Sequence, residues 1–417
     1  MKDNTPLAWA VRNISELFIG RRGPAAGREM GEAPVVRDAV VLIRDGIIEA
    51  SGAADVVAIP DEYDVVDAEG GCVVPGLVDC HTHTVFAGSR EAEFVQRCEG
   101  RSYAQIAESG GGIKMTVKSV RNASVEDLVE SALPRLRRML EAGTTTAEIK
   151  SGYGLTPDDE IKMLHAVHRL AKRQPMELIG TYLAAHTVPG EFAGRPNEYL
   201  DLVLDPAVLK RITDNGLAEF ADVFCERTAF DVDASRRFLT VCREHGLIPR
   251  LHADQITQCG ASRLAAELGA ASADHLECID DDGIAAMRSA GTVAVLLPAC
   301  SFFLGVEQAP ARRLIDAGLA VALATDLNPG SSLIESMPLV MSIACTQMHM
   351  TPTEALIAST ANSAAAIRRS DRLGALLPGM QADLLILDVP NHLQWAYHVG
   401  RNCVRTVIKR GNIVHPG

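Results

Sequence analysis

The hydrophobic and polar positions follow one repeating pattern through the middle of the chain. Between residues 73 and 371, short apolar runs alternate with longer stretches whose apolar positions recur at helical spacing. Two of these stretches, 124–143 and 234–246, end at a glycine, as many helices do. Eight apolar runs each predict a buried strand: GLVDCHTH (76–83), TTTAEIKS (144–151), LIGTYLAAHT (178–187), FADVFCER (220–227), LIPRLHAD (247–254), SADHLECI (272–279), GTVAVLLPA (291–299) and VALATDLNPG (321–330).

Eight strands that alternate with helices predict an α/β fold of the (β/α)8 TIM-barrel type. A doubly wound sheet also alternates, but no GxGxxG or P-loop motif follows an early apolar run. The glycine run 110–112 has no strand before it and no Lys-Ser/Thr pair after it. We therefore interpret this run as a mobile loop rather than a phosphate cradle.

Both ends of the chain carry β-type patterns. Residues 39–51 place two β-rich runs around Asp45-Gly46, which is a strong signal for a tight hairpin. Residues 382–389 and 404–414 behave in the same way, and we expect the second to turn at Gly411-Asn412.

These end segments predict one small domain beside the barrel. Helical alternation stops near Leu373, and Pro378-Gly379 marks the change. We expect residues 1–72 and 372–417 to form a discontinuous β-sandwich domain, with residues 73–371 as the barrel.

Composition narrows the possible functions. The formal net charge of −13 argues against binding to nucleic acid or to anionic membranes. The N-terminus has no apolar signal segment and no apolar run is long enough to span a bilayer, so we expect a cytoplasmic protein. The ten cysteines include no CxxC pair, and we expect most to be reduced and buried. A homodimer is the default expectation.

The predicted strand ends carry the candidate chemistry, because the active site of a TIM barrel lies at the C-terminal ends of its strands. His81 and His83 follow the first strand two positions apart, so both can face the barrel axis. Later strand ends carry His186, Glu226, His252, His275 and Asp326.

An HxH pair alone is a weak indication of metal, but here five of twelve histidines and an aspartate occupy strand ends. Three imidazoles and one carboxylate suit Zn²⁺ or Fe²⁺ and leave room for a water. Such a metal lowers the pKa of its water to about 7. The pattern therefore predicts a metal-dependent hydrolase.

Longer motifs carry a family resemblance. The segment PGLVDCHTH (75–83), with the flanking β-segments, resembles the amidohydrolase superfamily, and the order of the strand-end residues resembles its mononuclear members. The likeness runs from about residue 72 to 414. The loops resemble the imidazolonepropionase family at HTHTVFAGSREAEF (81–94), EIKSGYGL (148–155), AAHTVP (184–189), HADQ (252–255), SADHLE (272–277) and ATDLNPGSS (324–332).

The resemblance implies a site and a substrate. The implied substrate is 4-imidazolone-5-propanoate, a five-membered lactam that carries a propionate and that enzymes of this family open to N-formimidoyl-L-glutamate. The implied ligands of a single Zn²⁺ or Fe²⁺ are His81, His83, His252 and Asp326. The implied substrate contacts are Arg90, Tyr153, His186, Gln255, Asn328, Gly330 and Ser331.

Residue chemistry agrees with these placements. Arg90 suits bidentate binding of the propionate, and Tyr153 can hydrogen-bond the same group. We expect the turn 328–332 to open a helix whose free N–H groups and N-cap hydroxyls bind a second polar end of the substrate, with ordinary helix capping as the alternative. We expect His275 and Asp326 to handle protons during attack on the lactam carbonyl, and His186 to orient the ring.

Two positions distinguish this hypothesis from its alternatives. Lys150 follows the second strand, whereas dinuclear relatives carry a bridging lysine on the fourth, so we expect one metal. Gln255 stands where related deaminases carry a proton-transferring glutamate. The alternatives are another mononuclear amidohydrolase, such as a deaminase or cyclic amide hydrolase, and a non-enzymatic scaffold with the same fold. The intact ligand positions argue against the scaffold.

Overall fold

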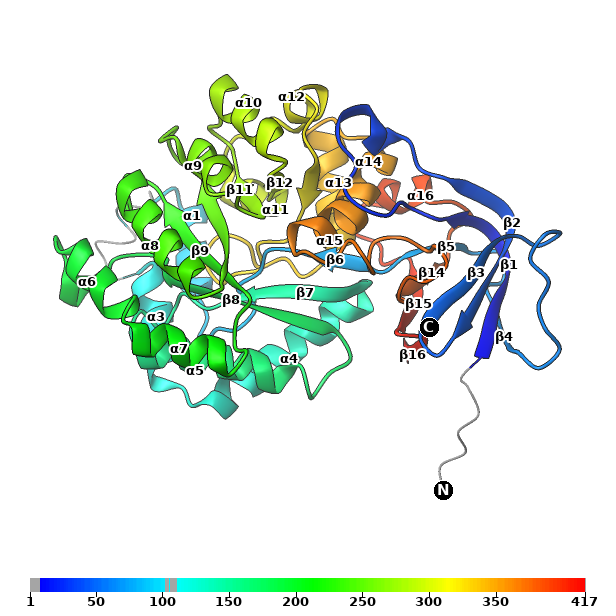
Figure 1. Cartoon of the computed structure of the whole chain (residues 1–417), viewed down its shortest axis with the longest axis horizontal. Coiled ribbons are helices and arrows are strands. Elements are labelled where there is room, and N and C mark those ends of the chain that lie inside the picture. Colours follow the sequence, from blue (N-terminus) through cyan, green and yellow to red (C-terminus); the bar gives the residue numbers. More distant parts are fainter. Residues whose placement is uncertain (1–7, 102–104, 106–110, 417) are drawn as a thin grey trace.

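The protein contains a barrel of eight parallel strands, seen at the centre of the computed structural model (Figure 1). The structure describes residues 8–101, 105 and 111–416, so Gly110 of the predicted loop lies outside the described residues. Neighbouring strands of the barrel follow one another in the sequence. Each predicted apolar run supplies one strand, which confirms the (β/α)8 prediction: β6 (Leu77–Asp79), β7 (Thr144–Lys150), β8 (Glu177–Ala185), β9 (Phe220–Cys225), β10 (Ile248–Ala253), β11 (Ser272–His275), β12 (Val293–Leu296) and β13 (Val321–Leu323).

The barrel closes between its first and last strands by contacts beyond the strand ends. The backbone N–H of Asp326 donates to the carbonyl of His81 at 3.1 Å, and that of His83 donates to the carbonyl of Leu327 at 2.9 Å. These bonds bring the segments after β6 and β13 side by side. The closure therefore places the histidine pair next to the aspartate.

Asp79, in β6, adds side-chain hydrogen bonds to this junction between the first and last strands. Its carboxylate accepts from the Thr325 backbone N–H at 3.1 Å and from the Thr325 hydroxyl at 2.6 Å. Burial raises the pKa of Asp79 to about 7. The hydrogen bonds from Thr325 offset part of the cost of burying this carboxyl group.

Helices surround the barrel, and both helical stretches predicted above are present. The helix α4 (Val125–Glu141) is capped by Ser124, and α8 (Val232–Glu244) is capped by Asp231. Each ends just before a glycine with positive φ, as predicted. The other helices are α1 (Glu91–Cys98), α3 (Ile113–Asn122), α5 (Pro157–Leu170), α6 (Pro196–Val203), α7 (Pro206–Asp214), α9 (Ala261–Glu267), α10 (Asp281–Ala290), α11 (Pro298–Leu304), α12 (Ala311–Asp316), α13 (Met337–Gln347), α14 (Pro352–Ile357), α15 (Ser363–Ala366), α16 (Leu393–Tyr397), and the short turns η1 (Gly27–Gly31), η2 (Gly190–Phe192) and η3 (Ala358–Asn362).

Within the described part of the chain, no helix has the length and apolar character needed to cross a membrane. The helices instead bury one face each against the strands. In α5, for example, Ile161, Leu164 and Val167 are buried while His165 and His168 are exposed. The two histidines of this helix therefore face away from the barrel.

The two ends of the chain form a separate sheet, seen at the right of Figure 1, where the blue and red segments meet. This sheet confirms the predicted second unit. Its strands run in the order β16-β15-β14-β5-β1-β2-β3, with β4 also paired to β1. Their bounds are β1 (Ala8–Phe18), β2 (Val35–Arg44), β3 (Ile47–Ala53), β4 (Asp64–Asp67), β5 (Cys72–Pro75), β14 (Leu384–Leu387), β15 (Val404–Lys409) and β16 (Asn412–His415).

Both predicted hairpins are present, and one turn differs in register. Asp45 and Gly46 have φ of +52° and +79°, as a tight hairpin turn requires. The last hairpin turns at Arg410-Gly411, with φ of +48° and +70°, and Asn412 already belongs to β16. The predicted turn at Gly411-Asn412 was wrong by one residue, because Gly411 takes the second of the two left-handed positions.

Side chains from both ends of the chain share one core. Trp9 and Val41 from the N-terminal strands pack in the same buried cluster as Ile386 and Ile408 from the C-terminal strands. Neither end could bury its apolar face alone. The domain boundaries at 72/73 and 371/372 stay a prediction.

Glu177, at the start of β8, ties the C-terminal segment to the barrel. Its carboxylate contacts Arg372 at 2.5 Å and Arg369 and Arg410 at 3.3 Å each. Burial alone would raise the pKa of Glu177, but Arg372, Lys409 and Arg369 hold that pKa at about 2. The ionised carboxylate therefore stabilises the folded state.

Replacing Glu177 with glutamine should destabilise the protein at neutral pH. We expect the Glu177→Gln variant to lose about 1–2 kcal/mol of unfolding free energy, after allowing for solvent screening. Because the folded pKa lies below the ordinary value of 4.5, the loss should be complete above pH 5 and should shrink as pH falls toward 2. Urea unfolding at several pH values measures this difference in unfolding free energy. Glu198→Gln, at an exposed position, serves as the control. Equal stability of the wild type and Glu177→Gln at pH 7 would show that the ionised Glu177 does not stabilise the fold.

Candidate metal centre

Three buried imidazoles converge at the C-terminal ends of β6 and β10. The candidate ligand nitrogens of His81, His83 and His252 all lie within 4.8 Å of one another. Asp326 Oδ1 lies 3.6 Å from Nε2 of both His81 and His83. The structure thus brings together the four residues that the family resemblance implied as metal ligands.

The chemistry of this group fits a divalent metal. Burial, together with Lys150 and neighbouring histidines, lowers the pKa of His81 and of His83 well below the ordinary value, so both rings are neutral. Among the described residues, the buried Nε2 of His81 has no hydrogen-bond partner. Neutral imidazoles with free lone pairs beside a carboxylate are the donor set of a zinc or iron site.

The backbone is held in a sparsely populated conformation at this centre. His275 has φ of +83° and Asp326 has φ of +50°, in the left-handed region that few residues other than glycine adopt. Such conformations persist only where the surrounding structure enforces them, and they occur often at functional sites. At Asp326 this conformation is held by the hydrogen bond from its backbone N–H to the carbonyl of His81, which joins the segments after β13 and β6.

Two buried aspartates orient the imidazoles from behind. Asp274 Oδ2 lies 2.6 Å from Nδ1 of His81, and Asp222 Oδ2 lies 3.1 Å from Nδ1 of His252. The proton of His81 therefore resides on Nδ1, which leaves the Nε2 lone pair directed toward Asp326. Carboxylates in this position fix the tautomer and orientation of metal-binding histidines.

Beneath these aspartates lies a network of buried charges. Lys150 Nζ contacts Glu148 at 2.9 Å and Asp222 at 2.8 Å, and Arg250 donates to Asp274 at 2.9 Å. All five side chains are fully buried. Although burial opposes it, the three carboxylates raise the pKa of Lys150, so the amine stays charged. This geometry agrees with the interpretation of Lys150 as a structural charge.

Sequence reasoning did not single out four members of this network: Glu148, Asp222, Arg250 and Asp274. A signal was present, because each is a charged residue inside an otherwise apolar strand run. Charged side chains are almost never fully buried unless they are paired. A charge within a run predicted to be a buried barrel strand therefore already implies a partner on a neighbouring strand.

His275 and Asp326 are the groups beside the imidazoles that can carry a proton. The His275 ring centroid lies 5.3 Å from that of His252, and its Nδ1 lies 3.7 Å from Glu277 Oε1. Although burial opposes it, Glu277 and Asp326 raise the pKa of His275. Burial raises the pKa of Asp326. Glu277, which the sequence did not single out, also accepts from the Ser301 hydroxyl at 3.1 Å.

His186 and Tyr153 line the same centre. The His186 ring stacks on His83 with centroids 5.1 Å apart and planes at 18°, and Tyr153 lies 5.4 Å from His186. Nδ1 of His186 lies 2.9 Å from the carbonyl of Gly152 and so donates to it. Burial lowers the pKa of His186 to about 3, which leaves a neutral ring with Nε2 as an acceptor.

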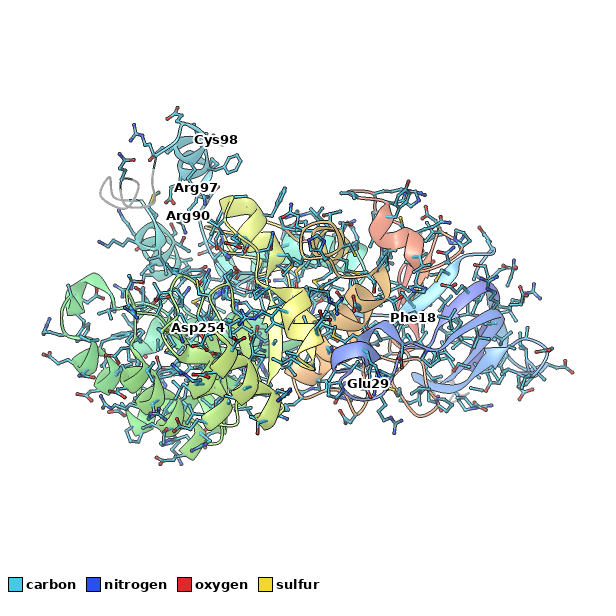
Figure 2. All side chains as sticks on the ribbon, turned by 90° about the horizontal axis from the view of Figure 1, so that it is seen from above. Phe18, Glu29, Arg90, Arg97, Cys98 and Asp254 are labelled. Carbon is cyan, nitrogen blue, oxygen red and sulfur yellow. The ribbon has the colours of Figure 1, made fainter. Side chains whose placement is uncertain are left out.

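Arg90 lies against the turn after β13, at the start of α1. A Cβ added to Gly330 would lie 2.1 Å from an Arg90 nitrogen, so the guanidinium packs directly against this glycine. Arg90 also donates to Glu93 at 2.6 and 2.9 Å, and Glu93 accepts the N–H of Gly112 at 2.7 Å. Arg90 and Arg97 occupy the same edge of the molecule in Figure 2. The sequence did not predict the Glu93 contact.

The turn after β13 differs from the expectation. Asn328 Oδ1 accepts the N–H groups of Gly330 and Ser331 at 2.8 Å each, and Asn328 bridges to Ser332. The next helix, α13, begins only at Met337. The prediction that this turn opens a helix with free N–H groups was wrong, because the asparagine side chain already satisfies them.

Gln255 lies on the loop after β10. Its Nε2 lies 3.9 Å from Sγ of Cys300, a buried thiol on α11 whose pKa is raised by burial and by Asp326. Glu226 holds this loop by accepting the N–H groups of Ile256 and Thr257 at 3.1 and 3.0 Å. The strand-end glutamate therefore supports a loop instead of facing the imidazoles.

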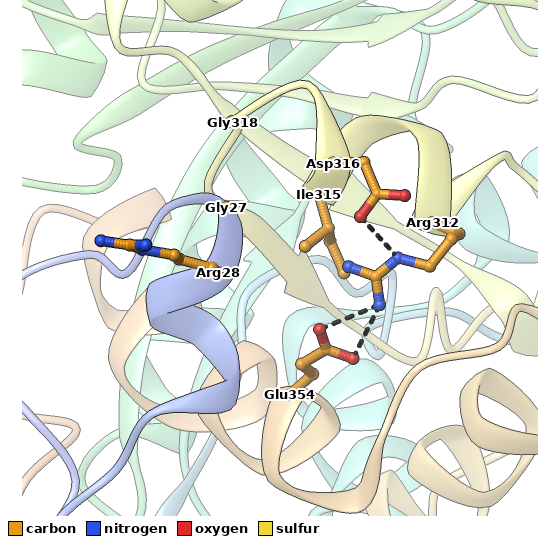
Figure 3. A pocket seen from close by; sticks show the side chains of 7 residues that line it. All are labelled: Gly27, Arg28, Arg312, Ile315, Asp316, Gly318 and Glu354. Carbon is orange, nitrogen blue, oxygen red and sulfur yellow. Dashed lines mark hydrogen bonds and ion pairs between the residues drawn. The ribbon is translucent and has the colours of Figure 1, made fainter.

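A surface cleft of about 510 Å³ lies elsewhere, between η1 and the helices α12 and α14 (Figure 3). Arg312 in this cleft donates to Asp316 at 2.9 Å and to both oxygens of Glu354. None of the imidazole-centre residues lines it. This cleft therefore adds no group to the candidate metal centre.

The barrel and its centre define a metal-dependent hydrolase class, and residues 72–414 match the Amidohydrolase family. In fold, the chain is similar to 5-methylcytosine deaminase from Klebsiella pneumoniae, with a TM-score of 0.75 and 18% identity over 98% of this chain and 97% of that one. The chain belongs to the amidohydrolase family.

Curated relatives narrow the position within this family to the imidazolonepropionases. The chain is 48% identical to "Imidazolonepropionase" of Geobacillus kaustophilus over 97% of this chain and 96% of the relative. It is also 48% identical to the Chloroflexus aggregans protein of the same name, over 94% of each chain. The sequence resemblance to the imidazolonepropionase family is thereby confirmed.

The contact between Asp274 and His81 gives a direct test of the centre. We expect Asp274→Asn to weaken divalent-metal binding about 10- to 100-fold, because the amide cannot match the charge that orients the ring. Competition with a chromogenic chelator measures this affinity. The control is Asp281→Asn, on the exposed first turn of α10. If Asp274→Asn keeps the wild-type far-ultraviolet circular dichroism spectrum and binds the metal with unchanged affinity, Asp274 does not orient His81.

Proposed function

We propose that the chain catalyses the imidazolonepropionase reaction, the hydrolysis of the lactam of 4-imidazolone-5-propanoate to N-formimidoyl-L-glutamate. The observation that carries the proposal is 48% identity to a curated imidazolonepropionase along nearly the whole chain. The buried imidazole–carboxylate group at the barrel mouth supplies the chemistry that this hydrolysis requires.

We propose one divalent metal, zinc or iron, held by His81, His83, His252 and Asp326. Such a metal, when bound, lowers the pKa of water to about 7 and so makes hydroxide available at neutral pH. Lys150 is engaged by Glu148 and Asp222, which supports a single metal rather than a lysine-bridged pair.

The protein side chains move the protons. Asp326, whose pKa is raised by burial, accepts the proton of the attacking water. His275, whose pKa is raised by Glu277 and Asp326, is protonated and donates a hydrogen bond to the oxyanion that forms at the lactam carbonyl. Asp326 then passes the proton that it took from the water to the ring nitrogen as the carbon–nitrogen bond breaks.

The remaining site residues position the substrate. Arg90 has donors beyond those it gives to Glu93, and with Tyr153 it would bind the propionate. Nε2 of His186 would accept an N–H of the ring. Gln255, on the loop after β10, would also contact the substrate. Asn328, Gly330 and Ser331, on the turn after β13, would do the same, and Gly330 lies beside the Arg90 guanidinium.

The main alternative is another mononuclear amidohydrolase, such as a deaminase. The solved 5-methylcytosine deaminase is similar to this chain in fold alone, at 18% identity. Gln255 cannot shuttle protons as the glutamate of such enzymes does. The cytoplasmic location and the homodimer expected from the sequence stay predictions.

Hydrolysis of freshly prepared 4-imidazolone-5-propanoate tests the proposal. We expect loss of its ultraviolet absorbance in the presence of purified protein, about one metal per chain, and loss of turnover after chelation with recovery on adding metal back. A fully metallated protein that leaves this substrate intact but opens another cyclic amide or amidine would contradict the proposed substrate.

His275→Ala tests the proton-handling assignment. We expect kcat to fall at least about 100-fold while metal content stays unchanged, because the hydrogen bond to the oxyanion is lost but the metal ligands are not. The matched control is His168→Ala, which removes an exposed histidine from α5. Near-normal turnover of His275→Ala at wild-type metal content would show that another group handles the proton.

A further inference from the structure

Two cysteines outside the metal centre lie against each other. Cys225 ends β9, and Cys259 lies on the loop between β10 and α9, 34 positions later in the chain. The Cys259 thiol donates to the backbone oxygen of Cys225 at a distance of 3.4 Å. All ten cysteines are described, and all are free thiols in this structure.

The two thiols differ in access to solvent. Cys225 is buried, at 1% exposure, whereas Cys259 is half-buried and lines a surface cleft of about 280 Å³ together with Arg227, Asp231 and Asp233. A small solute in this cleft therefore meets Cys259 first.

The two neighbouring thiols also ionise differently. The Cys225 side chain lowers the pKa of the Cys259 thiol, against the opposing effects of burial and of Asp254 and Glu226. The Cys259 side chain, together with burial, raises the pKa of Cys225. An accessible thiol that ionises more readily, beside a buried one, is the arrangement of a redox-sensitive cysteine with its resolving partner.

We propose that Cys225 and Cys259 form a peroxide-sensitive dithiol, in which Cys259 is oxidised first and Cys225 then closes a disulfide. This proposal does not depend on the proposed function. The Cys259 thiolate attacks hydrogen peroxide, the O–O bond breaks, and Cys259 becomes a sulfenic acid. The hydroxide that leaves takes up the proton released from the Cys259 thiol and forms the first water. The Cys225 sulfur then attacks the Cys259 sulfur, the S–O bond breaks, and the hydroxyl departs as water with the Cys225 proton. Overall, two thiols lose two electrons and peroxide is reduced to two waters.

The disulfide would join two segments that already contact each other. Asp254 accepts the N–H of Cys259 at 3.0 Å, and Glu226, next to Cys225, accepts the N–H groups of Ile256 and Thr257. The loop is thus held close to the end of β9 before oxidation. Closing the disulfide brings the two sulfurs to an S–S length of about 2.05 Å.

Peptide mapping tests the proposal on the full, metal-loaded chain. Trypsin releases Cys225 in the peptide 212–227 and Cys259 in the peptide 251–263, and each peptide holds a single cysteine. After hydrogen peroxide treatment, alkylation of free thiols and digestion, we expect the linked pair to appear and most of the two free peptides to disappear. Reduction before digestion should restore both free peptides.

Three variants make the test specific. Cys259→Ser should abolish the crosslink and leave Cys225 reduced, whereas Cys225→Ser should leave Cys259 as a sulfenic acid that a dimedone probe labels. Cys345→Ser, on α13, should keep the crosslink. Cys98, exposed on the outer edge of α1 and well away from Asp254 in Figure 2, reports non-specific oxidation.

The outcome is decided by the order of oxidation. Crosslinking of 212–227 to 251–263 before Cys98 is oxidised supports the proposal. Two outcomes would overturn the proposal. In one, Cys259 is oxidised beyond the sulfenic acid while Cys225 stays reduced. In the other, Cys98 is oxidised before Cys225 and Cys259. Both single variants should retain wild-type metal content, so a failed crosslink is distinguishable from loss of the metal centre.

Discussion

The buried charges beneath the imidazoles are the constraint on which the candidate site depends. Lys150 and Arg250 are fully buried among Glu148, Asp222 and Asp274. An unpaired charge at this depth costs several kcal/mol, so strands β7, β9, β10 and β11 can pair only in a register that brings these partners together. Two of the same carboxylates orient His81 and His252. The network that stabilises the barrel interior therefore also aims the metal ligands.

A second constraint is the seam between the first and last strands. β6 and β13 are joined through the backbone of His81, His83 and Asp326, so the contacts that close the barrel also set the separation of three ligand side chains. This shared role accounts for the left-handed backbone at Asp326. Barrel closure and metal binding are thus expected to stabilise each other.

Much of this architecture was predictable because it follows from local rules. Side-chain alternation and turn chemistry predict the eight strands and the hairpin at Asp45-Gly46. Since the C-terminal ends of barrel strands meet on one face, the strand-end histidines and Asp326 were expected to converge. The two wrong predictions also have local causes. No helix begins at the turn 328–332, where the Asn328 side chain accepts backbone N–H groups. The last hairpin turns one residue earlier than predicted, because Gly411 takes the second turn position.

The sequence by itself determined the order of strands and helices, the candidate ligands and the family, because these depend on residue type and spacing along the chain. Only the tertiary structure decided which side chains support them. Glu93 beside Arg90, Asp274 behind His81 and Cys259 against Cys225 are contacts made through packing. Apart from the neighbours Arg90 and Glu93, these partners are 34 to 193 positions apart. Such pairs are set by strand register and loop course, which a local pattern does not encode.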